Sequence, residues 1–139
     1  MMNVIAMDHI VLNVHDMDTM LDFYINVLGL QGERIEAFGE GRVPFPSVRI
    51  SADTLIDLFP MPAQSVAPAP GAGVKRLNHF CMVIEPAEMP AVVAHLEAHG
   101  VTVDEGPATR WGAHGNATSI YFNDPEGNRI EIRHYGDAD

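Results

Sequence analysis

Two histidines and two carboxylates occupy matching positions in the two halves of this 139-residue chain. His9 lies 48 residues before Asp57, and His79 lies 52 residues before Glu131. The flanking residues match in two pairs of segments: MDHIVLNV (7–14) with LNHFCMVI (77–84), and LIDL (55–58) with RIEI (129–132). Imidazole and carboxylate groups are ligands for divalent first-row metals. The repeat therefore predicts a metal site to which each half of the chain contributes.

The elements that must position these groups are strands with one apolar face. Side chains alternate over residues 7–15, so that Ile10, Leu12 and Val14 share one face while His9 points to the other. Isoleucine or leucine likewise flanks both carboxylates. A helix can cover the apolar face, so we expect the four candidate ligands to line the opposite, concave face of a curved sheet.

Each half of the chain reads as strand–helix–strand–strand–strand. In the first half a helix runs from an N-cap at Asp16 to Gly29, with strands at about 30–37, 47–51 and 54–59. The second half has a strand over 77–84, a helix over about 87–99 and strands near 101–104, 117–122 and 129–135. The segment RWGAHG (110–115) is expected to be a flexible loop. The predicted fold class is α+β, with one supersecondary module repeated.

The length fits one domain of residues 1–139, made of two modules joined by a linker. Module 1 covers about 5–60 and module 2 about 77–135. The segment between them, 60–76, contains four prolines and few bulky side chains, a composition typical of linkers.

Composition excludes several functions. The formal net charge of −11 disfavours nucleic acid and anionic membrane as partners. The only cysteine, Cys81, rules out an internal disulfide and a CxxC zinc site, and we expect it to be a buried apolar filler. No apolar run approaches the roughly 20 residues needed to cross a bilayer, which predicts a cytoplasmic protein.

Three segments resemble the vicinal oxygen chelate superfamily, which includes glyoxalase I, extradiol dioxygenases, fosfomycin-resistance thiol transferases and bleomycin-resistance proteins. These segments are DHIVL (8–12), FYINVLGL (23–30) and YFNDPEGNRIE (121–131). The third resembles the family signature F-x-D-P-[DE]-G-x-x-[IV]-E and is the most specific. The resemblance extends from Asp8 to Tyr135 and is greatest to small, single-chain glyoxalase-like members.

The resemblance implies that two βαβββ modules form a curved, cup-like mixed sheet with helices on its outer face. It places one divalent metal, Ni, Zn, Fe, Co or Mn, at His9, His79 and Glu131. In glyoxalase I a glutamate ligand falls where this chain has Asp57. Aspartate is one methylene shorter, so Asp57 is either a fourth ligand or a carboxylate hydrogen-bonded inside the cup.

By resemblance, the expected activity is a lactoylglutathione lyase-type isomerisation of a small substrate through a metal-bound enediolate. Glu131 is the first candidate for the base that moves the proton, and Asp57 the second. Glyoxalase I has an arginine at the position of Asn13 and an asparagine at that of Met61. Both help to hold glutathione in that enzyme, so the substrate of this chain stays open.

Other activities of the superfamily are alternatives. An extradiol dioxygenase would hold Fe(II) at the same ligands and use Tyr121, which falls where those enzymes have a tyrosine that contacts the diol. Asn13 and Arg133 share the faces of the candidate ligands and are either substrate contacts or solvated side chains. A fosfomycin-type thiol transferase and a metal-free drug-binding protein are further alternatives, although drug binders usually lack the ligands.

The resemblance also bears on assembly. Four-strand modules leave unpaired edges, which family members commonly close by dimerising or by exchanging modules. We therefore predict a C2 homodimer. The sequence leaves open whether each site is built by one chain or by two.

Overall fold

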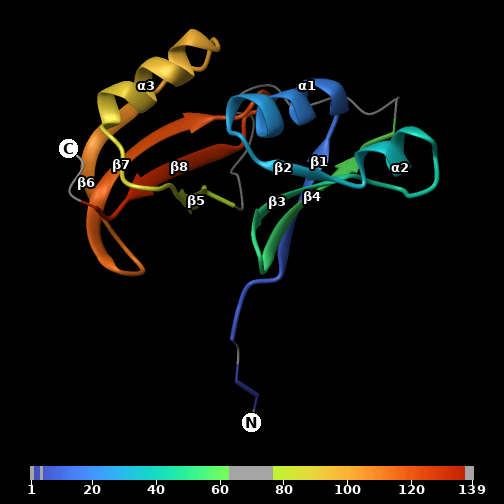
Figure 1. Ribbon diagram of the computed structural model, residues 1–139, viewed down its shortest axis with the longest axis horizontal. Coiled ribbons are helices and arrows are strands. Elements are labelled where there is room, and N and C mark those ends of the chain that lie inside the picture. Colours follow the sequence, from blue (N-terminus) through green and yellow to red (C-terminus); the bar gives the residue numbers. More distant parts are fainter. Residues whose placement is uncertain (1, 4, 63–76, 137–139) are drawn as a thin grey trace. The chain divides into compact units, whose positions relative to one another are not determined.

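The computed structural model describes residues 2–3, 5–62 and 77–136 (Figure 1). In this part of the chain eight strands form two four-stranded mixed sheets, accompanied by short helices. The chain divides into two compact units, Met1–Pro68 and Ala69–Asp139, and each holds one sheet. These findings confirm the α+β class and the repeated module. Closure of both modules into a single cup-like domain stays a prediction.

The first unit contains four strands and three short helical segments. In chain order they are β1 (His9–Val14), α1 (Met17–Asp22), the π-helix η1 (Phe23–Val27), β2 (Gln31–Glu33), α2 (Ile35–Gly39), β3 (Ser47–Ser51) and β4 (Thr54–Pro60). The strand order is β1-β4-β3-β2, with β1 parallel to β4 and the other pairs antiparallel. The buried apolar side chains are Leu12, Val14, Met20, Phe23, Tyr24, Val48, Ile56 and Leu58.

The α1–η1 segment begins and ends where the sequence predicts. The Asp16 carboxylate accepts a hydrogen bond from the Thr19 backbone N–H at 3.1 Å, which caps the helix. Gly29 has a φ of +79°, a conformation that favours glycine and stops the helix. The last turn, however, is a π-helix over Phe23–Val27.

The second unit repeats the arrangement. Its elements are β5 (Phe80–Val83), α3 (Met89–Ala98), β6 (Glu105–Gly112), β7 (Gly115–Asn123) and β8 (Arg129–His134). The strand order is β5-β8-β7-β6, with β5 parallel to β8 and the other pairs antiparallel. The buried apolar side chains are Met82, Met89, Leu96, Ile120, Tyr121, Phe122, Ile130 and Ile132.

Three expectations about local structure are wrong. The strand expected over 30–37 is limited to β2, because Arg34 has a φ of +63° and α2 begins directly after it. Residues 101–104 contain no strand, and β6 begins at Glu105. The expected loop over 110–115 is the end of the β6–β7 hairpin, paired up to Gly112 and Gly115.

The signature segment after β7 is a turn held by Asp124. This buried carboxylate accepts hydrogen bonds from the backbone N–H groups of Glu126 and Asn128, both at 2.9 Å, and from the Asn128 side-chain amide at 2.7 Å. Gly127, with a φ of +88°, completes the turn. The turn therefore fixes the register of β8 against β7.

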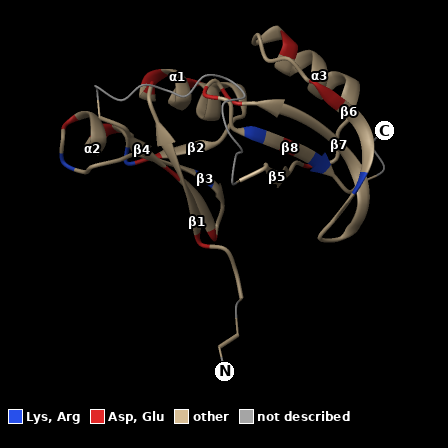
Figure 2. Cartoon of the chain, turned by 180° about the vertical axis from the view of Figure 1, so that it is seen from behind, with Lys and Arg blue, Asp and Glu red and all other residues tan. Residues whose placement is uncertain are grey.

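The chain has 19 acidic and 8 basic residues, which gives the net charge of −11. Figure 2 marks where the charged residues of the described part lie along the ribbon. Among the described residues, no helix is both long and apolar enough to cross a membrane.

Candidate metal centre

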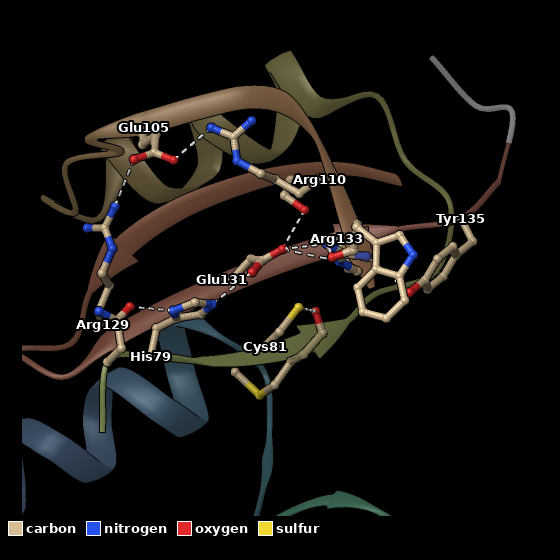
Figure 3. A network of polar contacts seen from close by, with 12 residues as sticks. His79, Cys81, Glu105, Arg110, Arg129, Glu131, Arg133 and Tyr135 are labelled. Carbon is tan, nitrogen blue, oxygen red and sulfur yellow. Dashed lines mark hydrogen bonds and ion pairs between the residues drawn. The ribbon is translucent and has the colours of Figure 1, made fainter. Parts of the chain in front are cut away.

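In the second unit, His79 faces Glu131. The His79 Nε2 atom lies 3.1 Å from Glu131 Oε1, and its Nδ1 atom lies 2.7 Å from the side-chain oxygen of Asn78 (Figure 3). A partner at Nδ1 fixes the ring orientation and leaves Nε2 to face the carboxylate or a metal ion.

In the first unit, His9 faces Asp57 in the same way. The His9 Nε2 atom lies 3.7 Å from Asp57 Oδ2, and its Nδ1 atom lies 2.6 Å from the Asp8 carboxylate. The hydrogen bond with Asp8 raises the pKa of His9. Asp57 is buried and accepts a hydrogen bond from the Ser47 hydroxyl at 2.6 Å.

Strand register explains both pairs. In the parallel pair β5–β8, Cys81 lies opposite Glu131, and His79 precedes Cys81 by two residues, so its side chain is on the same face. In β1–β4, Val11 lies opposite Asp57, and His9 precedes Val11 by two residues. The repeated sequence therefore produces the same local geometry twice.

Glu131 has an arginine partner in addition to a serine hydroxyl. The Ser119 hydroxyl donates to Glu131 Oε2 at 2.6 Å, and Arg133 donates to the same oxygen from Nη2 at 2.8 Å and Nε at 3.2 Å. Burial works to raise the pKa of Glu131, but the hydrogen bonds from Ser119 and Arg133 outweigh it and lower the pKa to about 2. Glu131 therefore carries a negative charge throughout the physiological range.

Tyr121 adjoins the pair in the second unit. It lies opposite Glu131 in the β7–β8 register, and its ring centroid is 5.6 Å from that of His79. The Arg129 guanidinium lies over the Tyr121 ring, 4.9 Å from its centroid. Burial, together with the hydrogen bond to Glu131, raises the pKa of the Tyr121 hydroxyl.

The two candidate substrate contacts differ in exposure. Asn13 is exposed on the His9 face of β1. Arg133 is only 3% exposed, and its guanidinium is occupied by Glu131, Tyr135 and the backbone oxygen of Trp111. Of the two, only Asn13 is placed to meet a ligand without first breaking contacts within the protein.

The donor atoms in each pair fit a small divalent cation. Metal–nitrogen and metal–oxygen bonds of about 2.0–2.2 Å place two neighbouring ligands about 3.0–3.5 Å apart. The separations of 3.1 Å in the His79–Glu131 pair and 3.7 Å in the His9–Asp57 pair are close to this range. Within the described residues, no three His, Cys, Asp or Glu side chains gather into a metal-holding group. The structure thus brings the predicted residues together in pairs.

Sequence reasoning missed the residues that orient each pair. Asp8 and Asn78 directly precede the two histidines, so their position in the repeat was the available indication. Ser47 and Ser119 become recognisable only once the register of the antiparallel strands is known.

Cys81 corrects another expectation. The side chain is exposed and lies on the face of His79, so it is not a buried filler. Its neighbours partly desolvate the thiol, which, together with the Glu131 charge, raises its pKa to about 11.

The repeated βαβββ module, with a histidine–carboxylate pair in each copy, defines a class of proteins that bind small molecules, many of them through a divalent metal. The family model of the Glyoxalase/Bleomycin resistance protein/Dioxygenase superfamily matches residues 6–132. The chain belongs to this superfamily.

Individual relatives agree with the assignment. The glyoxalase domain-containing protein RDO1 of Mycosarcoma maydis is 37% identical over 99% of this chain and 72% of its own length. A virulence protein of Salmonella typhimurium is 30% identical over 92% of this chain and 83% of its own length. The crystal structure of a glyoxalase/dioxygenase from Nostoc punctiforme has a TM-score of 0.75 at 25% identity, covering 99% of this chain and all of that one.

Proposed function

We propose that this protein is a divalent-metal-dependent enzyme of the glyoxalase type, acting on a small molecule with two neighbouring oxygens. The observation that carries the proposal is the pair of matched contacts, His9 with Asp57 and His79 with Glu131. In both, Nδ1 is held by the preceding residue, while Nε2 faces a carboxylate. A histidine that only stabilised its own strand would not need this arrangement in both modules.

We propose His9, His79 and Glu131 as the residues that hold the metal. Both histidines would bind through Nε2, since Nδ1 is engaged, and Glu131 would bind as a carboxylate that stays ionised. When bound, a divalent cation would supply positive charge beside the two substrate oxygens. The partners at Nδ1 would keep each ring in place as the ligand set forms.

We propose Asp57 as the base that removes a proton from the carbon next to the substrate carbonyl. From the sequence alone, Glu131 ranks first for this role. Arg133 and Ser119 hold Glu131 ionised with a pKa of about 2, which makes it a weak base. In the described part of the chain no arginine or lysine forms an ion pair with Asp57. Asp57 would return the proton to the adjacent carbon, so the reaction is an isomerisation without an external oxidant.

Metal analysis combined with activity tests this function. We expect the purified protein to take up one Ni²⁺, Co²⁺ or Zn²⁺ per chain and to isomerise methylglyoxal–thiol adducts. His79→Ala should remove metal binding, because it deletes a ligand. Asp57→Asn should reduce turnover by about 10²–10⁴-fold, the range for loss of a general base, with a much smaller effect on metal affinity.

His99→Ala, at the exposed end of α3, is the matched control and should change neither property. Absence of divalent-metal uptake by the wild-type protein would contradict the proposal and favour a metal-free binding protein.

The environment of Tyr121 supports a second candidate, an Fe(II) extradiol dioxygenase. Its hydroxyl hydrogen-bonds to Glu131 and its ring lies against His79, so a diol bound beside these ligands would meet it. Under this alternative, the Fe²⁺-loaded protein consumes oxygen with catechols, and Tyr121→Phe slows the reaction. Oxygen consumption with catechols and no activity on thiol adducts would decide for the dioxygenase.

A further inference from the structure

We propose that Gly112, at the end of β6, is a positioning residue that makes Glu131 bind its metal through one oxygen only. It acts by leaving the space that the Arg133 guanidinium occupies. The inference rests on the proposed metal site and adds the way in which Glu131 enters it.

The Arg133 guanidinium is enclosed by protein groups. Its Nε and Nη2 atoms donate to Glu131 Oε2, Nη2 also donates to the Trp111 backbone oxygen at 3.0 Å, and Nη1 donates to the Tyr135 hydroxyl at 3.1 Å. The residue is 3% exposed. These contacts come from β6, β8 and the residue that follows β8, so the guanidinium is fixed from several directions (Figure 3).

Only glycine fits at position 112, because any side chain there would overlap the Arg133 guanidinium. A Cβ atom on Gly112 would lie 1.9 Å from Arg133 Nη1, 2.7 Å from Arg133 Cζ and 2.9 Å from the Tyr135 hydroxyl oxygen. Its backbone φ lies outside the left-handed region, so other residues can adopt the same backbone conformation. The glycine therefore matters through the guanidinium that it accommodates.

The consequence for Glu131 follows from its two oxygens. Oε2 accepts hydrogen bonds from Ser119 and, twice, from Arg133, which occupies its lone pairs. Oε1 faces His79 Nε2 at 3.1 Å. Only Oε1 is therefore oriented toward the other proposed ligand in this unit, and Oε2 is held away from it.

The first module has no arginine at the position that corresponds to Arg133. Phe59 lies two residues after Asp57, at the position where Arg133 follows Glu131. Phe59 packs against Phe45, with ring centroids 4.4 Å apart. The group of Ser119, Arg133 and Tyr135, here called the clamp, therefore distinguishes the two carboxylates of the repeat and restricts Glu131 to ligation.

The test uses the full chain and Co²⁺ as the metal probe. In the metal-free protein, the Arg133 Nε–H should give a slowly exchanging ¹⁵N–¹H signal, assigned by its loss in Arg133→Lys. Gly112→Ala should abolish this protection by displacing the guanidinium. It should also weaken Co²⁺ binding about tenfold, the lower end of what loss of a partner to a metal ligand costs.

Two further variants keep the test decisive. Gly39→Ala is the matched control, since a Cβ there meets no atom within 4 Å, and it should leave the signal and the affinity unchanged. If Gly112→Ala does not fold, Tyr135→Phe removes one acceptor of Arg133 and should shift both readouts in the same direction by a smaller amount.

Crystal structures of the Co²⁺-loaded wild type and Gly112→Ala give the direct readout. We expect Glu131 to contact the ion through Oε1 alone in the wild type and through both oxygens in the variant. Two-oxygen binding in the wild type, or unchanged Co²⁺ affinity in Gly112→Ala after loss of the Arg133 signal, would overturn the inference and leave the proposed metal site standing. Absence of Co²⁺ binding by the wild type would overturn the proposed function itself.

Discussion

Asp57 and Glu131 occupy equivalent positions in the repeat, yet their surroundings differ. Each carboxylate accepts a hydrogen bond from a serine hydroxyl and faces the Nε2 atom of a histidine. Only Glu131 has an arginine two residues later on its strand. Two carboxylates that are held in different environments can take different chemical roles. This difference is the residue-level basis for assigning metal ligation to Glu131 and proton transfer to Asp57.

The depressed pKa of Glu131 predicts a specific acid sensitivity. A carboxylate whose pKa falls from an ordinary 4.5 to about 2 on folding stabilises the native state above about pH 4.5 and loses that effect as the pH falls toward 2. Glu131→Gln cannot titrate. We therefore expect the stability difference between metal-free wild type and Glu131→Gln to narrow steadily from pH 6 to pH 2, measured by urea unfolding. A difference that stays constant over this range would show that Glu131 is not held ionised by its neighbours.

At the level of elements, the sequence predicts β1, β3, β4, β7 and β8 to within two residues of their observed bounds. Local backbone effects were harder to predict. Arg34 takes a left-handed conformation that its residue type does not suggest, and it separates β2 from α2. The glycines of the segment 110–115 predict a loop, but the segment is the end of a hairpin, and the close approach of Arg133 explains Gly112.

The candidate site was likewise only partly predictable from the sequence. Its four central residues are visible in the repeated sequence, since His9, Asp57 and Glu131 lie on strands whose side-chain period is two and His79 directly precedes β5. The clamp of Arg133, Ser119 and Tyr135 depends on the pairing of β7 with β8 and on the end of β6, which alternation alone does not specify. Residues that position other residues are therefore the part that required the structure.

The position of Glu131 on β8 depends on the Asp124 turn, which directly precedes this strand. Asp124→Ala removes an acceptor from two backbone N–H groups and one side-chain amide in a buried turn. We expect a loss of about 2–3 kcal/mol in the free energy of unfolding, measured by urea denaturation. Asp53→Ala, in the exposed turn between β3 and β4, should cost much less. Equal effects of the two variants would mean that the signature turn contributes no special stability.

At the scale of the whole molecule, each unit supplies one histidine–carboxylate pair and has unpaired strand edges. In the described residues β1 and β2 are the outer strands of the first sheet, and β5 and β6 are those of the second. Exposed edges tend to be covered by pairing with another chain or module. The proposed set of three ligands takes residues from both units, so the proposal links metal binding to the way in which the units assemble.

This linkage leads to the prediction that the protein is a C2 homodimer. Light scattering should give a mass twice the 15.2 kDa of one chain, and a monomer would contradict the prediction. Co-expression of His9→Ala with His79→Ala then locates the two halves of each site. If a site combines His9 of one chain with His79 of the other, the mixed dimer regains one intact site and binds one metal ion. If both histidines of a site belong to one chain, every site in the mixed dimer lacks a ligand and metal binding stays absent.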